Sequence, residues 1–315
     1  MKIPVLLLVY NRPNETKKVL NKLRQFKINK LFISSDGSKD NYKDQKLYLQ
    51  TQKIIKKFKN KNVKIQILDN NYGCKIAVTK AINWFFSQVE EGIILEDDCI
   101  PNKSFFDFCK KMLKKYRYSN IKVISGNNFL NGKVKIEEDY YFSKYNHCWG
   151  WATWKHAWKL YDSEMIKWER FKETKKWKKL IGEKIERNYW EKIFDLCKKN
   201  KIDSWAYPWL YSIWLKEGFT IIPKYNLVKN IGLLGAHNAF NTKFNLKTKN
   251  ISSKLNHPKK IAINDFADAY VLKNFFKPKN FLYPFRLLYI FKLFINNPIK
   301  FIKIIYKKLI NKIND

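Results

Sequence analysis

Apolar runs and helical patterns alternate through the first 95 residues, and this alternation constrains the fold more than any other feature of the sequence. Four strand-like runs and three helical patterns take turns along the chain: 5–9, 14–25, 31–34, 45–58, 63–68, 75–87 and 92–95. Parallel strands need crossover connections and are covered by helices on both faces. The pattern therefore predicts an α/β fold with a mostly parallel, doubly wound, Rossmann-like sheet and flanking helices.

The rest of the chain divides into an aromatic-rich part and a basic extension. Strands are expected at 122–125 and 219–222, charged helices over 159–201, and dense aromatic segments at 140–158 and 205–214. We expect residues 1–240 to form one domain whose two parts meet near residue 125. Residues 241–315 then form an extension that is polar up to Asn264 and helical and basic beyond it.

Three consecutive acids, Glu96, Asp97 and Asp98, directly follow the apolar run of 92–95. Like charges this close together raise one another's pKa, and a divalent cation removes that cost. Mg²⁺ and Mn²⁺ prefer carboxylate oxygens, and phosphate oxygens can complete their shell. We interpret the triplet as a metal site, in preference to a plain acidic turn before the helix expected at 105–115.

Polar residues follow the expected parallel strands at their carboxyl ends, where open α/β sheets bind ligands. The phosphate-loop patterns GxGxxG and GxxxxGK[ST] are absent from the sequence. A nucleotide bound here must therefore be held by strand-end loops and a metal. The net charge of +36 favours such a polyanionic ligand. The residues that we expect to contact it are Tyr10, Asn11, Arg12, Asp36, Gly73 and Lys75.

The segment Trp149-Gly150-Trp151 admits two interpretations that the sequence alone does not separate. Tryptophans are usually part of a core, but aromatic rings also face the apolar side of sugar rings. Glycine between them suits a close approach of the backbone to a flat ligand. Five cysteines without CxxC spacing indicate packing residues in a reducing compartment, and argue against both a disulfide framework and a zinc module.

Taken together, these blocks resemble metal-dependent glycosyltransferases of the GT-A fold, in the bacterial branch related to family 2 enzymes and to the N-acetylglucosaminyltransferase I group. The resemblance spans residues 3–240 and is carried by Val9–Pro13, Ser35–Gly37, Asn71–Lys75, Ile94–Asp98, Trp149–Trp154 and Asn226–Gly232. It implies a hexosyl- or N-acetylhexosaminyltransferase that moves a sugar, with inversion, from a nucleotide-diphospho-sugar to a glycan or lipid-linked acceptor. The setting implied is bacterial surface polysaccharide assembly, with a UDP-sugar as the favoured donor.

The resemblance also implies roles for particular residues. The donor half is residues 1–125, and the acceptor half is residues 126–240. Asp98 takes the place of the direct Mn²⁺ or Mg²⁺ ligand of the DXD motif, and the metal or diphosphate lies near the histidine that His237 matches. Glu96 and Asp97 would hold ribose or sugar hydroxyls. Acceptor or sugar contacts fall to Trp149, Gly150, Trp151 and Trp205.

The chain departs from the family pattern at the general base. The family commonly has Trp-Asp-x-x-Trp, whereas this chain has Trp205-Ala206-Tyr207-Pro208-Trp209, and alanine cannot accept a proton. Three explanations are open: Asp203 substitutes as the base, position 206 carries an engineered substitution, or the protein binds the sugar nucleotide without catalysing transfer. Glu217 is a more distant candidate for the base.

Residues 281–313 alternate apolar clusters with lysine and arginine, as an interfacial helix on an anionic leaflet does. We expect a protein in the cytoplasm, peripheral on the inner face of the cytoplasmic membrane; the alternative is a terminal helix packed on the domain.

A nucleotidyltransferase is the second enzyme class considered, although it usually needs a glycine-rich phosphate loop. Nucleic acid is not an expected partner, because no RRM, KH or helix-turn-helix pattern is visible and phosphate contacts do not need the acidic triplet.

Overall fold

The predicted alternation of strands and helices is confirmed in the structure, a computed structural model that describes residues 3–232, 246–282 and 295. The order is β1 (Val5–Val9), α1 (Pro13–Gln25), β2 (Leu31–Ser35), α2 (Tyr42–Lys57), β3 (Val63–Ile67), α3 (Gly73–Phe86) and β4 (Glu91–Glu96). The helix bounds differ from the expected ones by up to three residues. α1, for example, begins at Pro13, whose fixed φ and missing N–H suit the first turn of a helix.

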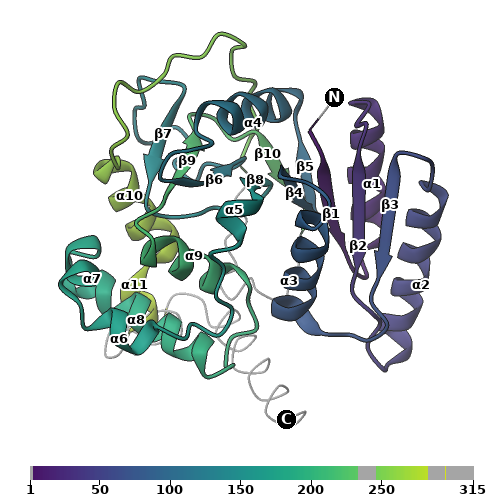
Figure 1. Cartoon of the computed structure of the whole chain (residues 1–315), viewed down its shortest axis with the longest axis horizontal. Coiled ribbons are helices and arrows are strands. Elements are labelled where there is room, and N and C mark those ends of the chain that lie inside the picture. The colour runs from purple at the N-terminus through teal and green to yellow at the C-terminus, as the bar shows by residue number, and fades with distance from the viewer. Residues whose placement is uncertain (1–2, 233–245, 283–294, 296–315) are drawn as a thin grey trace.

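Strands β3, β2, β1 and β4 lie side by side in that order and are all parallel. The chain steps in one direction from β1 to β3 and then reverses to reach β4. Because such crossovers are right-handed, α1 and α2 cover one face of the sheet and α3 covers the other, as Figure 1 shows. The carboxyl ends of these strands therefore meet at one edge, with the end of β1 in the middle.

The second part of the chain extends this sheet to eight strands. The added strands are β6 (Ile121–Ser125), β7 (Tyr140–Ser143), β8 (Trp151–Trp154) and β9 (Phe219–Pro223), and the full order is β3-β2-β1-β4-β8-β6-β9-β7. β8 is antiparallel to both of its neighbours, and β7 is antiparallel to β9. The sheet is thus mixed, with a parallel first half, rather than parallel throughout.

A short second sheet lies directly after the acidic triplet. It pairs β5 (Cys99–Pro101) with β10 (Val228–Asn230) in antiparallel fashion, so Asn230 lies opposite Cys99. The backbone N–H of Ile231 continues this ladder by donating to the carbonyl of Asp98 at 2.8 Å. Residues 228–231 therefore run alongside the triplet.

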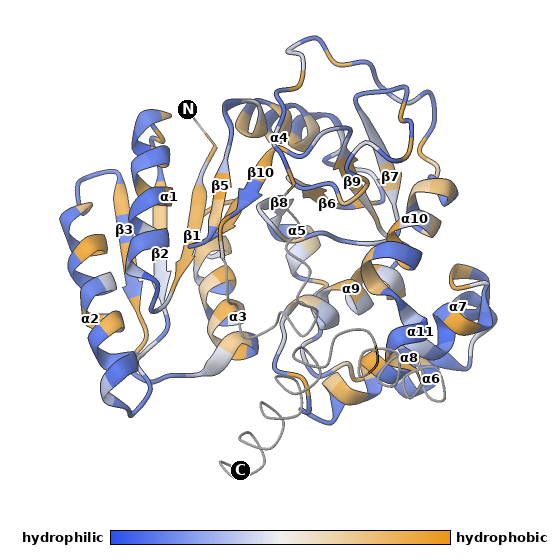
Figure 2. Ribbon diagram, turned by 180° about the vertical axis from the view of Figure 1, so that it is seen from behind, coloured by the Kyte–Doolittle hydropathy of each residue, from blue (hydrophilic) through white to orange (hydrophobic). Residues whose placement is uncertain are grey.

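Helices fill the regions where charged and aromatic patterns were expected. They are α4 (Lys103–Lys115), α5 (Lys155–Trp158), α6 (Trp168–Lys172), α7 (Lys175–Leu180), α8 (Lys184–Lys198) and α9 (Ala206–Leu215). α6 to α9 close around buried tryptophans, among them Trp168, Trp177, Trp190 and Trp214, each fully buried. Figure 2 shows the contrast in hydropathy between the apolar central strands and the polar outer surfaces of flanking helices such as α1 and α2.

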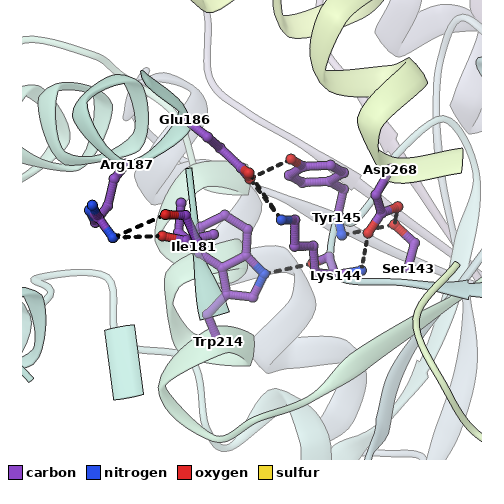
Figure 3. A network of polar contacts seen from close by, with 9 residues as sticks. Ser143, Lys144, Tyr145, Ile181, Glu186, Arg187, Trp214 and Asp268 are labelled. Carbon is purple, nitrogen blue, oxygen red and sulfur yellow. Dashed lines mark hydrogen bonds and ion pairs between the residues drawn. The ribbon is translucent and has the colours of Figure 1, made fainter. Parts of the chain in front are cut away.

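The described part of the C-terminal extension, residues 246–282, packs against the domain. It contains α10 (Asp265–Val271), the π-helical η1 (Leu272–Phe276) and α11 (Pro278–Phe281). Asp268 on α10 accepts hydrogen bonds from Ser143 Oγ at 2.5 Å and from the Lys144 N–H at 3.0 Å. Lys144 Nζ in turn lies 3.0 Å from Glu186 on α8, so this buried network joins three segments (Figure 3).

The predicted amphipathic helix of 281–313 falls almost wholly outside the described residues. Within the described ranges, no helix is long and apolar enough to cross a membrane. Residues 265–281 are helical, as expected beyond Asn264, whereas the basic character of the extension stays a prediction.

Candidate functional site

The predicted ligand-binding loops that follow the neighbouring strands β2, β1 and β4 meet at one edge of the sheet. Val9 at the end of β1 pairs with Ser35 at the end of β2, and Leu8 pairs with Glu96 at the end of β4. The loops that follow these strands carry Tyr10 to Arg12, Asp36, and Asp97 with Asp98. The structure thus brings together side chains from distant parts of the sequence that the strand pattern placed at a common edge.

An ion-pair cluster forms where the β1 and β4 loops touch. Arg12 Nη1 lies 2.8 Å from Asp98 Oδ2 and 3.2 Å from Asp97 Oδ1. The backbone N–H of Tyr10 donates to the other oxygen of Asp97 at 3.3 Å. Both aspartate side chains are buried, whereas the Arg12 side chain is 32% exposed. One guanidinium therefore bridges two of the three consecutive acids.

The electrostatics of the triplet reflect burial first and crowded negative charge second. Burial, followed by the charges of Asp98 and Asp97, raises the pKa of Glu96 to about 8, although Arg12 opposes the shift. Burial also raises the pKa of Asp97 to about 7 against the opposing charge of Arg12. A single guanidinium thus does not neutralise the cluster, and the ionised triplet would be stabilised by a further cation.

Of the two metal ligands proposed from the sequence, Asp98 is among the described residues and His237 is not. Within the described ranges, no three His, Cys, Asp or Glu side chains are arranged to hold a metal ion. Asp97 and Asp98 converge on Arg12 instead. His237 belongs to 233–245 and lies outside the described residues, so its role as a metal ligand stays a prediction. The chain reaches that segment through Gly232, where a Cβ would lie 2.3 Å from Asp98 Oδ2.

Tyr10 and Asn11 are held by Asp44, a residue that the sequence patterns did not single out. The Tyr10 hydroxyl donates to Asp44 Oδ2 at 2.7 Å, and Asn11 Nδ2 donates to Asp44 Oδ1 at 2.6 Å. Asp44 also receives the backbone N–H of Lys39 at 2.9 Å and is 8% exposed. Its place in the first turn of α2, three residues after the N-cap Asn41, is the one local signal that could have identified it.

Asp36 organises the loop before α3 from the end of β2. One oxygen accepts the N–H groups of Tyr72 at 2.9 Å and Gly37 at 3.0 Å, and the other accepts from Gly73 at 3.1 Å and from the Asn71 side chain at 3.1 Å. Burial raises the pKa of Asp36 even though these N–H groups favour its charged form. Gly73 has φ +75°, a backbone conformation that favours glycine. The predicted ligand-binding carboxylate thus also has a structural task.

Asp203 and Lys75 are part of the contact between the two halves of the domain. Asp203 Oδ2 and Oδ1 accept the backbone N–H groups of Cys74 and Lys75, each at 2.8 Å, and so cap the N-terminus of α3. Lys75 Nζ pairs with Glu164 at 3.0 Å and donates to Asn200 at 3.2 Å. The side chain expected to hold phosphate therefore lies among residues of the second half.

The charges of the capping carboxylate and of the acidic triplet both act on the Cys74 thiol. Burial, followed by the charges of Glu96 and Asp203, raises the pKa of its thiol to about 12. The five cysteines are free, and Cys99, Cys109 and Cys197 are buried, which agrees with their interpretation as packing residues.

The expected sugar-binding tryptophans divide into core and partly accessible positions. Trp151 and Trp205 are 1% and 3% exposed and stack with ring centroids 5.3 Å apart, so they belong to the core. Gly150, at φ +69°, allows close approach to Val228, which a Cβ would meet at 2.8 Å. This glycine thus accommodates a protein side chain. Trp149 is half-buried, and Ala206 begins α9 directly after Trp205.

Comparison with known proteins gives no family assignment. No protein-family model matches the sequence, and no curated protein matches it. The solved structure of HddC from Yersinia pseudotuberculosis aligns with 49% of this chain and 77% of its own, at 12% identity and a TM-score of 0.32. A cytidylyltransferase from Leptospira borgpetersenii serovar Hardjo-bovis (strain JB197) aligns with 51% of this chain and 63% of its own, at 14% identity and a TM-score of 0.32. Similarity at this level carries no argument about activity.

Proposed function

We propose that this chain is a glycosyltransferase that uses a nucleotide-diphospho-sugar donor and a divalent cation. The observation that carries the proposal is the acidic triplet Glu96–Asp98 at the carboxyl edge of a Rossmann-like sheet, beside Arg12 from the neighbouring strand. Ligands of open α/β sheets bind at this edge. Carboxylates and a guanidinium close together suit a ligand that carries both a metal ion and phosphate oxygens.

The residues present fit a cation held by few protein ligands. Mg²⁺ and Mn²⁺ in nucleotide sites use one or two carboxylates and leave the rest of the shell to phosphates and water, so a cluster of three protein ligands is not required. Asp98 is the proposed direct ligand of the cation. Glu96 and Asp97 would hold ribose or sugar hydroxyls, and His237 would lie near the metal or the diphosphate. Burial and the crowding of the three carboxylates oppose ionisation, as the raised pKa values of Glu96 and Asp97 indicate, and an added cation would relieve that cost. A bound divalent ion would neutralise charge that builds on the departing diphosphate.

The strand-end loops would frame the nucleoside. Asp44 fixes Tyr10 and Asn11 in one orientation, and Asp36 fixes the loop before α3. Such preorganised side chains lose little conformational freedom when a ligand binds. Because these residues are already hydrogen-bonded within the protein, we propose that they shape the nucleoside pocket, and that Arg12 is the group that meets the diphosphate.

The acceptor side supports a second candidate function, a sugar-nucleotide-binding protein with little transferase activity. Ala206 has no proton-accepting group at the family's base position. Both oxygens of Asp203 already accept backbone N–H groups, so taking a proton from an acceptor hydroxyl would compete with the cap of α3. This engagement favours slow transfer in the chain as it stands.

For the acceptor, we propose a glycan or lipid-linked saccharide presented at the inner face of the cytoplasmic membrane. Support comes from the basic, amphipathic sequence of 281–313, whose lysines would lie over anionic headgroups. A polysaccharide acceptor under assembly at that surface would then be within reach of the domain.

A panel of sugar nucleotides tests the proposal. Thermal shift with UDP-, GDP- and CDP-sugars, each with and without Mn²⁺, should show stabilisation by one nucleotide class only when Mn²⁺ is present, because a bound ligand stabilises the folded state by mass action. Parallel assays for pyrophosphate release from nucleoside triphosphates and sugar phosphates test the nucleotidyltransferase alternative. Stabilisation by triphosphates with pyrophosphate release, and none by sugar nucleotides, would contradict the glycosyltransferase proposal.

A further inference from the structure

Arg12 forms an ion pair with Asp98, the residue that the proposed function assigns as the metal ligand. Its Nη1 lies 2.8 Å from Asp98 Oδ2 and 3.2 Å from Asp97 Oδ1. Among the described residues, Arg12 is the one cation that forms an ion pair with the triplet. Lys75, the other basic residue expected at this edge, pairs with Glu164. Arg12 is thus the counter-ion of the triplet in this structure.

The position of the guanidinium conflicts with a divalent ion on the same oxygen. Arg12 Nη1 lies 2.8 Å from Asp98 Oδ2. A Mg²⁺ or Mn²⁺ ion bound to the same oxygen at about 2.1 Å would therefore lie within about 5 Å of that guanidinium nitrogen. Charges of the same sign at that distance repel each other, and a divalent ion doubles the effect. A metal ion that arrives alone must therefore displace Arg12 or bind weakly.

A displaced Arg12 needs a new anion. Its side chain is only 32% exposed, and loss of both aspartates would leave a half-buried charge without a partner. Diphosphate oxygens accept a guanidinium in bidentate geometry at least as well as a carboxylate does. Arg12 also sits directly before Pro13, at the N-cap of α1, so its backbone is anchored and only the side chain has to move.

We propose that Arg12 couples metal and nucleotide binding by exchanging Asp98 for the donor diphosphate. The metal ion takes the carboxylate as Arg12 leaves it, and the diphosphate binds both cations. This inference rests on the proposed donor site. Its consequence is thermodynamic coupling: the nucleotide raises the affinity for the metal ion, and the metal ion raises the affinity for the nucleotide by the same factor.

Calorimetric titration of the full chain with MnCl₂ alone, and with UDP at saturating MnCl₂, tests the exchange. In Arg12→Met the competitor of the metal ion is gone, so affinity for Mn²⁺ alone should rise about tenfold, while affinity for UDP with Mn²⁺ should fall about tenfold. Electron paramagnetic resonance of free Mn²⁺ gives the first quantity independently. Arg24→Met removes a charge from the far end of the same helix, where Arg24 stacks on Phe58, and should change neither affinity.

Arg12→Lys is the second variant, because it keeps a cation beside Asp97 and Asp98 and guards against loss of folding in Arg12→Met. Its affinity for Mn²⁺ alone should stay close to that of the parent. Unchanged or weaker Mn²⁺ binding by Arg12→Met, or a tenfold gain in both variants, would overturn the exchange. Failure of the donor site itself has a different signature: neither the parent nor any variant binds UDP, whatever the response to MnCl₂ alone.

Discussion

The carboxylate of Asp203 accepts the backbone N–H of Lys75 at 2.8 Å across 128 residues of sequence. With the matching bond from Cys74, it caps α3 from the loop that leads into α9. The segment expected to face the acceptor is thereby tied to the loop expected to face the donor. A side chain that the sequence offered as a catalytic base is, in the structure, a link between the two halves of the domain.

Asp203→Ala should therefore destabilise the fold. Loss of a carboxylate that caps two N–H groups costs about 1–2 kcal/mol of unfolding free energy. Chemical denaturation monitored by circular dichroism measures the difference. Asp107→Asn, which alters an exposed acid on α4, serves as the matched control and should leave stability unchanged. Equal stability of Asp203→Ala and parent would show that the cap contributes nothing.

Ala206→Asp should increase transfer to the acceptor by at least about tenfold, because general-base assistance is worth about 10²–10⁴-fold. An acidic side chain at the first residue of α9 also suits the helix dipole, so the fold should tolerate it. Sugar transfer from the donor identified by the nucleotide panel is the measurement, and donor affinity should change little.

Two further variants identify the source of any gain. Ala206→Asn matches the new side chain in size but cannot act as a base, so it should show no increase. If Ala206→Asp gives no gain while Asp203→Asn eliminates transfer with its fold intact, the base is Asp203 and the interpretation of position 206 is wrong.

The stability of the protein should depend on pH through Asp268. Burial raises its pKa to about 7, whereas an aspartate in an unfolded chain has a pKa of about 3.9. Between these values the folded state holds a proton that the unfolded state has released, so this group makes stability fall as pH rises from about 4 to about 7. Asp268→Asn removes the titration.

The measurement is the difference in unfolding free energy between Asp268→Asn and the parent at pH 5 and at pH 8. That difference should move in favour of the variant by about 2–3 kcal/mol as pH rises. Asp265→Asn, on the exposed side of the same helix, is the control and should show no such change. A pH-independent difference for Asp268→Asn would contradict the prediction.

Truncation after Leu282 should separate membrane contact from folding. Phe281 packs with Tyr189 at 5.4 Å between ring centroids, and Leu282 is buried. A cut before Phe281 would therefore remove part of the core, whereas a cut after Leu282 keeps both residues. The truncated protein should keep its melting temperature but no longer sediment with phosphatidylglycerol-containing vesicles. High salt should release part of the full chain by screening. A truncated protein that melts at a much lower temperature would favour the alternative of a terminal helix packed on the domain.

The first half of the fold was predictable because its strand runs, its helical patterns and its polar loop residues all indicate the same topology. Strand runs such as Val5–Val9 are continuous and apolar, the helices between them are amphipathic, and polar residues stand where the strands end. Parallel topology then dictates that loops as distant as those holding Arg12 and Asp98 share an edge.

The second half was harder to predict from local pattern. β7 and β8 are buried at every residue, so their sequences lack the alternation that marks a half-exposed strand. The tasks of Asp203 and Asp268 arise from contacts between segments 124 to 129 residues apart, and no local spacing encodes such contacts. Gly150 was consistent with a ligand, but the close neighbour that it permits is Val228.

Calorimetric titration of UDP into parent and Asp98→Asn, with Mn²⁺ present, decides whether Glu96–Asp98 is the cation-dependent donor site. The substitution keeps the shape of the side chain and removes its charge. Mn²⁺-dependent UDP binding should be lost in Asp98→Asn while its circular dichroism spectrum stays that of the parent. Equal UDP affinity in the two proteins would contradict the assignment.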